Sequence, residues 1–163
     1  MENCGTIWEI VGERANLFAF KGTYYNSVDH KGRMSIPAKF RDMTDSPSGD
    51  HYVLARGFDG CLYLYPLESW LRVQQKIAEL KTISDRRARY FMHTLIGQAA
   101  DVKLDKLGRI MIPQILLDLA GIKKDVVVIG VLDKMELWDP EILKKYEDNQ
   151  PESYEDVAGQ LLI

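Results

Sequence analysis

The chain has 163 residues, of which 46% are hydrophobic and 28% charged, a composition typical of a globular protein that builds its own core. The net charge of −3 and the pI near 5.6 argue against a protein that binds nucleic acid over its whole surface, but they allow a local basic patch. Neither a secretory signal nor an apolar run of about 20 residues is present, so we expect a cytoplasmic protein without membrane contact.

The first half of the chain indicates a hairpin, a short helix and a second hairpin. Asp29 to Gly32 has the chemistry of a type I turn, with Asp at its first position and Gly where a positive φ is tolerated. Pro37 suits the first turn of a helix. The expected elements are strands at 24–28 and 33–36, a helix at 38–43, a loop at 44–50, and strands at 51–56 and 61–65.

The middle of the chain indicates helices. Helical spacing with one polar interruption is seen at Leu67, Trp70, Leu71, Gln74, Ile77 and Ala78. Ser84 is the expected N-cap of a helix over 85–96. The apolar stripe of this second helix is expected to face the core rather than a ligand, and consists of Ala88, Phe91, Met92 and Leu95.

The second half predicts the same order of elements. Strands are expected at 102–104 and 109–112 around a turn at 105–108, followed by a helix that Pro113 opens and Gly121 closes. Further strands are expected at 126–131 and 135–138. The acidic stretch from Asp148 to Asp156 contains Pro151 and predicts a loose tail.

This similarity reflects an internal repeat. The pattern D-x-x-G-R-apolar-x-I-P runs from Asp29 to Pro37 and again from Asp105 to Pro113, 76 residues later. Residues 59–66 and 133–140 form a second matching pair, in the same order. The two matches indicate a duplicated module. One module is too small for a good core, so we expect the two to share one.

Charge distinguishes the two copies. Between Lys21 and Arg41 there are five basic residues and one acidic residue, a net charge of +4, whereas between Lys103 and Asp118 three basic residues stand against two acidic ones, a net charge of +1. A phosphate within a Debye length of about 10 Å responds to the local patch more than to the distant net charge. The first module is therefore the expected DNA-binding one.

A two-stranded ribbon can enter the major groove, and arginine is the side chain best suited to bidentate contact with guanine. Arg33 is therefore predicted to contact a base edge, while Lys31, Lys39 and Arg41 are predicted to contact phosphates. The complete set of predicted DNA-binding residues is Arg33, Lys31, His30, Lys39, Arg41 and Lys21. For Lys31, Lys39 and Arg41, a solvated surface without DNA contact is the alternative interpretation.

A second set of motif residues has a predicted structural role. Asp29 repels phosphate, so we expect it to orient Arg33 and close the turn, and we expect Asp105 and Arg109 to act likewise in the second copy. These structural turn residues are Asp29, Gly32, Asp105, Gly108 and Arg109. For either turn alone, a purely structural role is an equally available interpretation.

Other functions have weaker support. No catalytic residues are predicted, because the three histidines stand outside recognisable motifs and no nucleophile signature or phosphate-binding glycine loop occurs. Cys4 and Cys61 are isolated, which indicates no disulfide framework, and Cys61 is expected to be buried. No metal, cofactor or small-molecule substrate is indicated. The alternative function is a protein-interaction or assembly module of the AbrB type that does not bind DNA.

The motif residues resemble a known family. The segment from Tyr25 to Arg41 is similar to the first signature of the MraZ family, which belongs to the SpoVT/AbrB superfamily, and 57–66, 99–113 and 120–138 resemble its later segments. The family's D-x-x-x-R motif falls on Asp29 and Arg33, and again on Asp105 and Arg109. Leu107 departs from the pattern, because a polar turn residue is more usual there.

The resemblance implies an α+β fold in which tandem SpoVT/AbrB-like modules form a pseudo-twofold swapped-hairpin β-barrel with flanking helices. It also implies a ring-like homo-oligomer that binds direct repeats in double-stranded DNA upstream of its own gene. The expected function is repression of a cell-division and cell-wall gene cluster, and the expected location is the nucleoid.

The predicted organisation has five parts. Residues 1–22 are an N-terminal extension, of which 1–19 are additional to the family. The first module spans 23–70, a helical connector spans 71–98, the second module spans 99–142, and a C-terminal tail spans 143–163.

Overall fold

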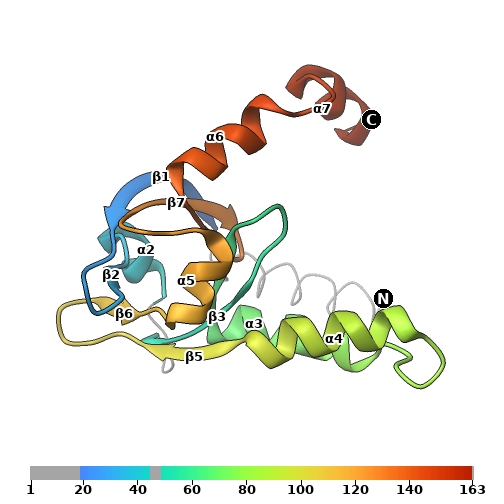
Figure 1. Cartoon of the computed structure of the whole chain (residues 1–163), viewed down its shortest axis with the longest axis horizontal. Helices are drawn as coiled ribbons and strands as arrows, with labels where there is room; N and C mark the ends of the chain where they lie inside the picture. Colours follow the sequence, from blue (N-terminus) through green and yellow to red (C-terminus); the bar gives the residue numbers. More distant parts are fainter. Residues whose placement is uncertain (1–18, 45–48, 163) are drawn as a thin grey trace, which may run out of the picture.

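The computed structural model describes residues 19–44 and 49–162 of the chain and combines an antiparallel sheet with helices (Figure 1). The prediction of an α+β fold is confirmed. The strands are β1 (Phe20–Ser27), β2 (Arg33–Ser35), β3 (His51–Arg56), β4 (Leu62–Pro66), β5 (Ala100–Lys103), β6 (Arg109–Met111), β7 (Asp125–Leu132) and β8 (Met135–Trp138). The helices are α2 (Ala38–Met43), α3 (Leu67–Ala78), α4 (Arg86–Gln98), α5 (Gln114–Ala120), α6 (Pro140–Asp148) and α7 (Tyr154–Leu162).

The strands of the two halves interleave. Six strands form one sheet in the order β1-β7-β8-β4-β3-β5, and β2 pairs with β6 in a separate two-stranded ribbon. If each strand of the first half is exchanged with its counterpart in the second, this order reads the same from the other end. Both halves therefore contribute to every part of the sheet.

The six-stranded sheet is open within the described residues. Its edges are β1, which pairs only with β7, and β5, which pairs only with β3. The predicted closed barrel is thus not seen in the strand pairing. Instead, the β2–β6 ribbon lies close to the sheet, because Val28 at the end of β1 forms a bridge with Met34 of β2.

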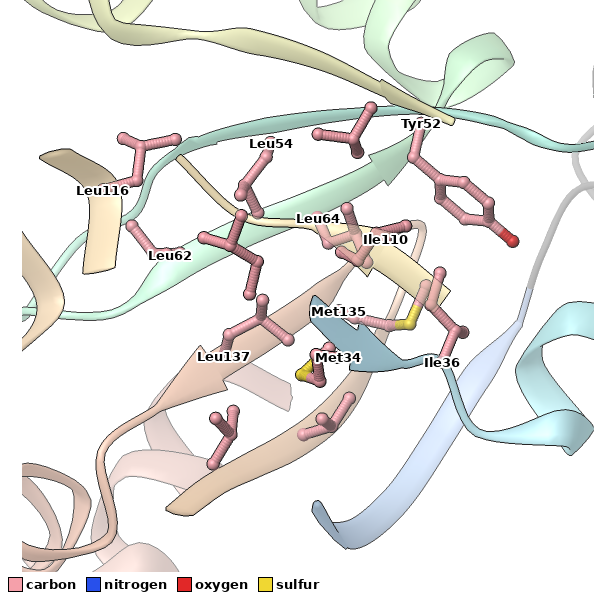
Figure 2. Packing of buried hydrophobic residues seen from close by; sticks show 14 of the residues in the cluster. Met34, Ile36, Tyr52, Leu54, Leu62, Leu64, Ile110, Leu116, Met135 and Leu137 are labelled. Atoms are coloured by element: carbon pink, nitrogen blue, oxygen red, sulfur yellow. The ribbon is translucent and has the colours of Figure 1, made fainter. Parts of the chain in front are cut away.

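The ribbon and the sheet share one core. Met34 and Ile110 are directly opposite each other in the ribbon and are each 1% exposed. They pack in the same cluster as Leu62, Leu64 and Leu137 of the sheet (Figure 2). Burying each such side chain contributes about 1.5–3 kcal/mol. Neither half could bury these residues alone, which agrees with the expectation of a shared core.

Helices α3 and α4 cover a second cluster. Trp70 and Ile77 of α3 and Leu95 of α4 pack against Val53 and Tyr65 of the sheet. The predicted core stripes are therefore confirmed only in part, because Leu71 and Phe91 remain 47% and 38% exposed and Gln74 and Ala78 are exposed as well.

One capping prediction is wrong. Asp85, not Ser84, is the N-cap of α4, and its Oδ1 accepts hydrogen bonds from the backbone N–H groups of Arg87 (2.8 Å) and Ala88 (3.4 Å). A carboxylate at this position is as good an acceptor as a hydroxyl and also favours the positive end of the helix.

The two ends of the chain also differ from expectation. Helix α7 begins inside the predicted loose stretch 148–156 and continues to Leu162. Before its first residue, Ser153 Oγ accepts a hydrogen bond from Asp156 N at 3.1 Å. Strand β1 begins at Phe20, inside the predicted extension, because the Phe20 ring is fully buried against Phe40. The expectations for residues 1–18, including Cys4, lie outside the described residues. Across 19–44 and 49–162, no helix combines the length and apolar character needed to span a bilayer.

Candidate nucleic-acid interface

The Asp29 turn holds Arg33 in one position. Asp29 Oδ1 accepts hydrogen bonds from the backbone N–H groups of Lys31 and Arg33, both at 2.9 Å. Its Oδ2 accepts a hydrogen bond from Arg33 Nε at 2.7 Å. Gly32 N donates to Asp29 O, and Gly32 has a φ of 80°. Through these bonds Asp29 closes the turn and holds the Arg33 side chain against it.

The second turn repeats this geometry. Asp105 Oδ1 accepts from Leu107 N and Arg109 N, both at 2.9 Å, and its Oδ2 accepts from Arg109 Nε at 2.8 Å. Gly108 has a φ of 75°. The arginine side chains are similarly accessible, 27% for Arg33 and 26% for Arg109. The turn geometry alone therefore does not distinguish the two copies.

These hydrogen bonds stabilise the carboxylates. The Arg33 backbone N–H, followed by the guanidinium and the Lys31 N–H, lowers the pKa of Asp29 to about 2. The same arrangement, led by the Arg109 backbone N–H, lowers the pKa of Asp105. Both carboxylates therefore stay charged to a lower pH than an ordinary aspartate, which preserves the orientation of both arginines in mild acid.

The lowered pKa predicts an acid-sensitive contribution to stability. Because the folded pKa of Asp29 lies below its unfolded value, the unfolded state binds more protons as the pH falls from about 4 to about 2, and stability declines across that window. Asp29→Asn removes the titration, so we expect a shallower decline than in the wild type. The free energy of unfolding, measured in urea at several pH values between about 4 and 2, tests this expectation. Asp42→Asn, which removes an exposed carboxylate, is the control. Parallel curves for Asp29→Asn and wild type would contradict the prediction.

The two arginines share one surface. In the β2–β6 ribbon, Arg33 is opposite Met111 and Ser35 is opposite Arg109. Strand side chains alternate between faces, and Met34 and Ile110 point into the core, so these four residues occupy the outer face. Arg33 and Arg109 are then diagonal neighbours, whose separation in a sheet is about 7–8 Å. The sequence did not reveal this juxtaposition of residues from separate halves.

The other predicted DNA-binding residues surround this face unevenly. His30 and Lys31 are exposed at the tip of the first turn, and Lys39 is exposed on α2, the helix that follows β2. Lys21 is also exposed, but it lies near the start of β1, seven residues before Val28 and thus about 23 Å away along an extended strand. His30 and Lys31 thus belong to the turn that holds Arg33, Lys39 lies on the next helix, and Lys21 lies apart from the turn.

Arg41 has an additional structural contact. Its Nε donates to Ile36 O at 3.1 Å, and its guanidinium lies against Gly108, where an added Cβ would collide with it. The repeat offset makes Leu117 the counterpart of Arg41, and Leu117 lies near Gly32 in the same way. Arg41 therefore joins the two halves, so any phosphate contact would depend on its terminal nitrogens.

The second half presents apolar side chains at equivalent positions. Leu107, Met111 and Ile115 stand where the first half has Lys31, Ser35 and Lys39. Their exposed fractions are 69%, 57% and 60%. One side of the ribbon is therefore basic and the other apolar. The repeat alignment contained this signal, but only the shared ribbon shows that the two sides adjoin.

The fold and this site define a class of protein. It has a duplicated α+β module that places two arginines on one exposed β-ribbon, and each arginine is held by an ion pair with an aspartate of its own turn. The model of the MraZ protein family matches residues 19–91 and 95–162. This chain belongs to the MraZ family.

Relatives support the same assignment. The chain is 39% identical over 142 residues to a protein of Halothermothrix orenii, covering 87% of this chain and 96% of that protein. It is 39% identical over 144 residues to a protein of Acetivibrio thermocellus, covering 88% and 97%. Each of these relatives is named "Transcriptional regulator MraZ". A solution structure of a Pyrococcus horikoshii protein covers 74% of this chain and 96% of its own, at 15% identity and a TM-score of 0.34. This similarity is too low to support a shared fold.

Proposed function

We propose that this chain is a sequence-specific DNA-binding transcriptional regulator. The main observation behind this proposal is the β2–β6 ribbon, on which Arg33 and Arg109 are each held by an aspartate of their own turn. His30 and the positively charged Lys31 and Lys39 flank this ribbon on one side. A ribbon fits the major groove, and a preorganised guanidinium loses less freedom when it contacts a base. The names of the relatives support the same function.

The proposal extends to the barrel, the oligomer, the DNA target and the location of the protein. We propose that modules 23–70 and 99–142 form a pseudo-twofold swapped-hairpin barrel, which the symmetric strand order supports. The regulator acts as a ring-like homo-oligomer on direct repeats upstream of its own gene. It represses a division and cell-wall gene cluster, and it resides in the cytoplasm on the nucleoid. Several weak ribbon contacts combined in one assembly would give useful avidity.

The proposal predicts a specific effect of Arg33. We expect Arg33→Ala to weaken binding to the upstream duplex by about 1–3 kcal/mol and to reduce the preference over a scrambled duplex. Lys39→Ala should weaken both duplexes alike and flatten the salt dependence, because a phosphate contact does not read sequence. Fluorescence anisotropy across a salt series measures both effects.

Two controls sharpen this experiment. Arg109→Ala reports on the second turn, since the two arginines share one face, and Lys144→Ala removes an exposed charge of α6, well away from the ribbon. If wild type binds both duplexes equally and weakly, sequence-specific recognition is wrong. If Arg33→Ala leaves affinity unchanged, its proposed role as a base contact is wrong.

An alternative function is a protein-interaction or assembly module that does not bind DNA. The observation favouring it is the apolar side of the ribbon formed by Leu107, Met111 and Ile115, since charged residues are normally depleted at protein interfaces. The same anisotropy experiment discriminates, because a pure assembly module would show no salt-dependent binding to either duplex.

A further inference from the structure

The C-terminal arm, residues 140–162, ends in helix α7, which contributes no residue to the hydrophobic clusters of the described chain. Helix α7 has apolar residues at helical spacing, namely Tyr154, Val157, Ala158 and Leu161. Tyr154 and Leu161 are 83% and 79% exposed. All nine residues of α7 belong to the described part of the chain, and none is buried. In Figure 1 the arm projects from the sheet and carries α7 away from the rest of the chain.

A helix as short as α7 is not expected to be stable unless its apolar face packs against another surface. Isolated helices shorter than about 12–15 residues are marginal in water, and most helices in proteins depend on packing of their apolar face. Helix α7 has nine residues. A capping hydroxyl from Ser153 adds about 1 kcal/mol, which does not replace packing. The apolar stripe therefore indicates a docking partner.

A matching groove lies where α4, the second helix of the α3–α4 hairpin, meets the turn between β3 and β4. Phe58, Tyr90, Phe91 and Leu95 line a groove of about 210 Å³, with Arg56 at its edge. Phe58 and Tyr90 are 61% and 70% exposed. Small-molecule sites usually have volumes of about 300–1,000 Å³, so this groove suits anchoring side chains of a helix better than a separate ligand.

The charges of the two surfaces are complementary. Helix α4, which forms one wall of the groove, carries three basic side chains and no acidic one, a net charge of +3, whereas the C-terminal arm carries six acidic and two basic ones, a net charge of −4. Arg86 and Arg87 are one helical turn before Tyr90, on the same face. Glu155 and Asp156 adjoin the apolar stripe of α7. Like charges would oppose such docking, and these opposite charges favour it.

We propose that α7 of one copy docks in the groove between α4 and the β3–β4 turn of a second copy. Within one copy α7 lies apart from α4 (Figure 1), so the two surfaces meet between copies. This contact is head-to-tail, and a head-to-tail contact closes into a ring when the rotation permits. The inference rests on the homo-oligomer of the proposed function and assigns its interface.

The first test replaces an apolar side chain on the stripe of α7 with a charged one. We expect Leu161→Asp to reduce self-association by about tenfold or more in sedimentation velocity, as for an interface anchor. Gln160→Asp, which places the same charge on the polar face of α7, should leave association nearly unchanged. Thermal unfolding of the dissociated protein should show an intact core, because α7 buries no residue. Equal association of both variants with the wild type would overturn the inference.

The second test exchanges charges. Glu155→Lys/Asp156→Lys and Arg86→Glu/Arg87→Glu should each reduce association, since each creates like-charge contacts. Mixing the two variants should restore it, because native and exchanged pairs then both match. Failure of the mixture to associate overturns the inference. So does a loss of duplex binding in Arg86→Glu/Arg87→Glu without a change in assembly, which would assign the hairpin to DNA.

Two further outcomes separate this inference from the proposed function. If deletion of residues 1–18 abolishes association while Leu161→Asp does not, the N-terminal segment is the occupant and the inference is wrong. If the wild type is monomeric at every concentration, the inference is also wrong, yet a preference of that monomer for the upstream duplex would leave the regulator function standing.

Discussion

Leu137→Ala is expected to destabilise the whole protein by about 2–5 kcal/mol, the usual loss for a large-to-small change in a packed core. Leu137 is fully buried and is directly opposite Leu62 and Val128. It lies in β8, which pairs with β4 where the two halves meet in the sheet. Because the halves share this core, we expect one cooperative transition at a lower urea midpoint with an unchanged slope.

Leu107→Ala is the matched control, since Leu107 is 69% exposed and surface changes usually alter stability by no more than about 0.5 kcal/mol. Two separate transitions in Leu137→Ala, with only one shifted, would show that the halves unfold independently and would contradict the shared core.

The second large effect is expected at Gly32. Its φ of 80° is in the region that disfavours side chains, and an added Cβ would lie 2.8 Å from the carbonyl oxygen of Ile112. A strained backbone of this kind costs about 1–3 kcal/mol. The overlap adds to that cost, because a backbone oxygen cannot move aside as a side chain can. Gly32→Ala should therefore lower stability by at least this amount in urea unfolding.

Gly97→Ala provides the control for this change. Gly97 lies inside α4, where an added Cβ would come within 4 Å of no neighbouring group in the described part of the chain. Alanine should therefore stabilise the helix by about 0.5–1 kcal/mol. Opposite signs for the two substitutions are expected. A Gly32→Ala variant as stable as the wild type would contradict this prediction, because the backbone at Gly32 and Ile112 would then shift at little cost to accept the added Cβ.

The Gly32 contact also connects stability to the candidate site. Ile112 N donates to Gly32 O at 2.8 Å, and Ile36 N donates to Gly108 O at 3.1 Å. Each arginine turn is therefore anchored on the strand end of the other half. We expect damage to one turn to disturb the position of both arginines, so DNA affinity of Gly32→Ala should fall together with its stability.

Local features of the fold were predictable from sequence because they depend on neighbouring residues. The two turns follow from Asp and Gly at fixed spacing, since the Asp side chain bonds backbone groups two and four residues later. The helix after Pro113 and its end at Gly121 follow from a fixed φ and a left-handed one. The repeat itself implied two similar modules, and the concentration of charge in the first one located the basic residues.

Other features depended on segments far apart in the chain. Pairing β2 with β6 places Arg33 and Arg109 on one ribbon, although 76 residues separate them. Local pattern does not specify such a pairing, because it depends on which apolar surfaces can be buried together after loop closure. The same reason explains why Arg41, read as a surface residue, lies against Gly108. The sequence by itself determined the turns, the repeat and the charged module. Only the tertiary structure decided that both arginines share one face and that α7 joins none of the hydrophobic clusters of the described chain, because both features depend on long-range packing.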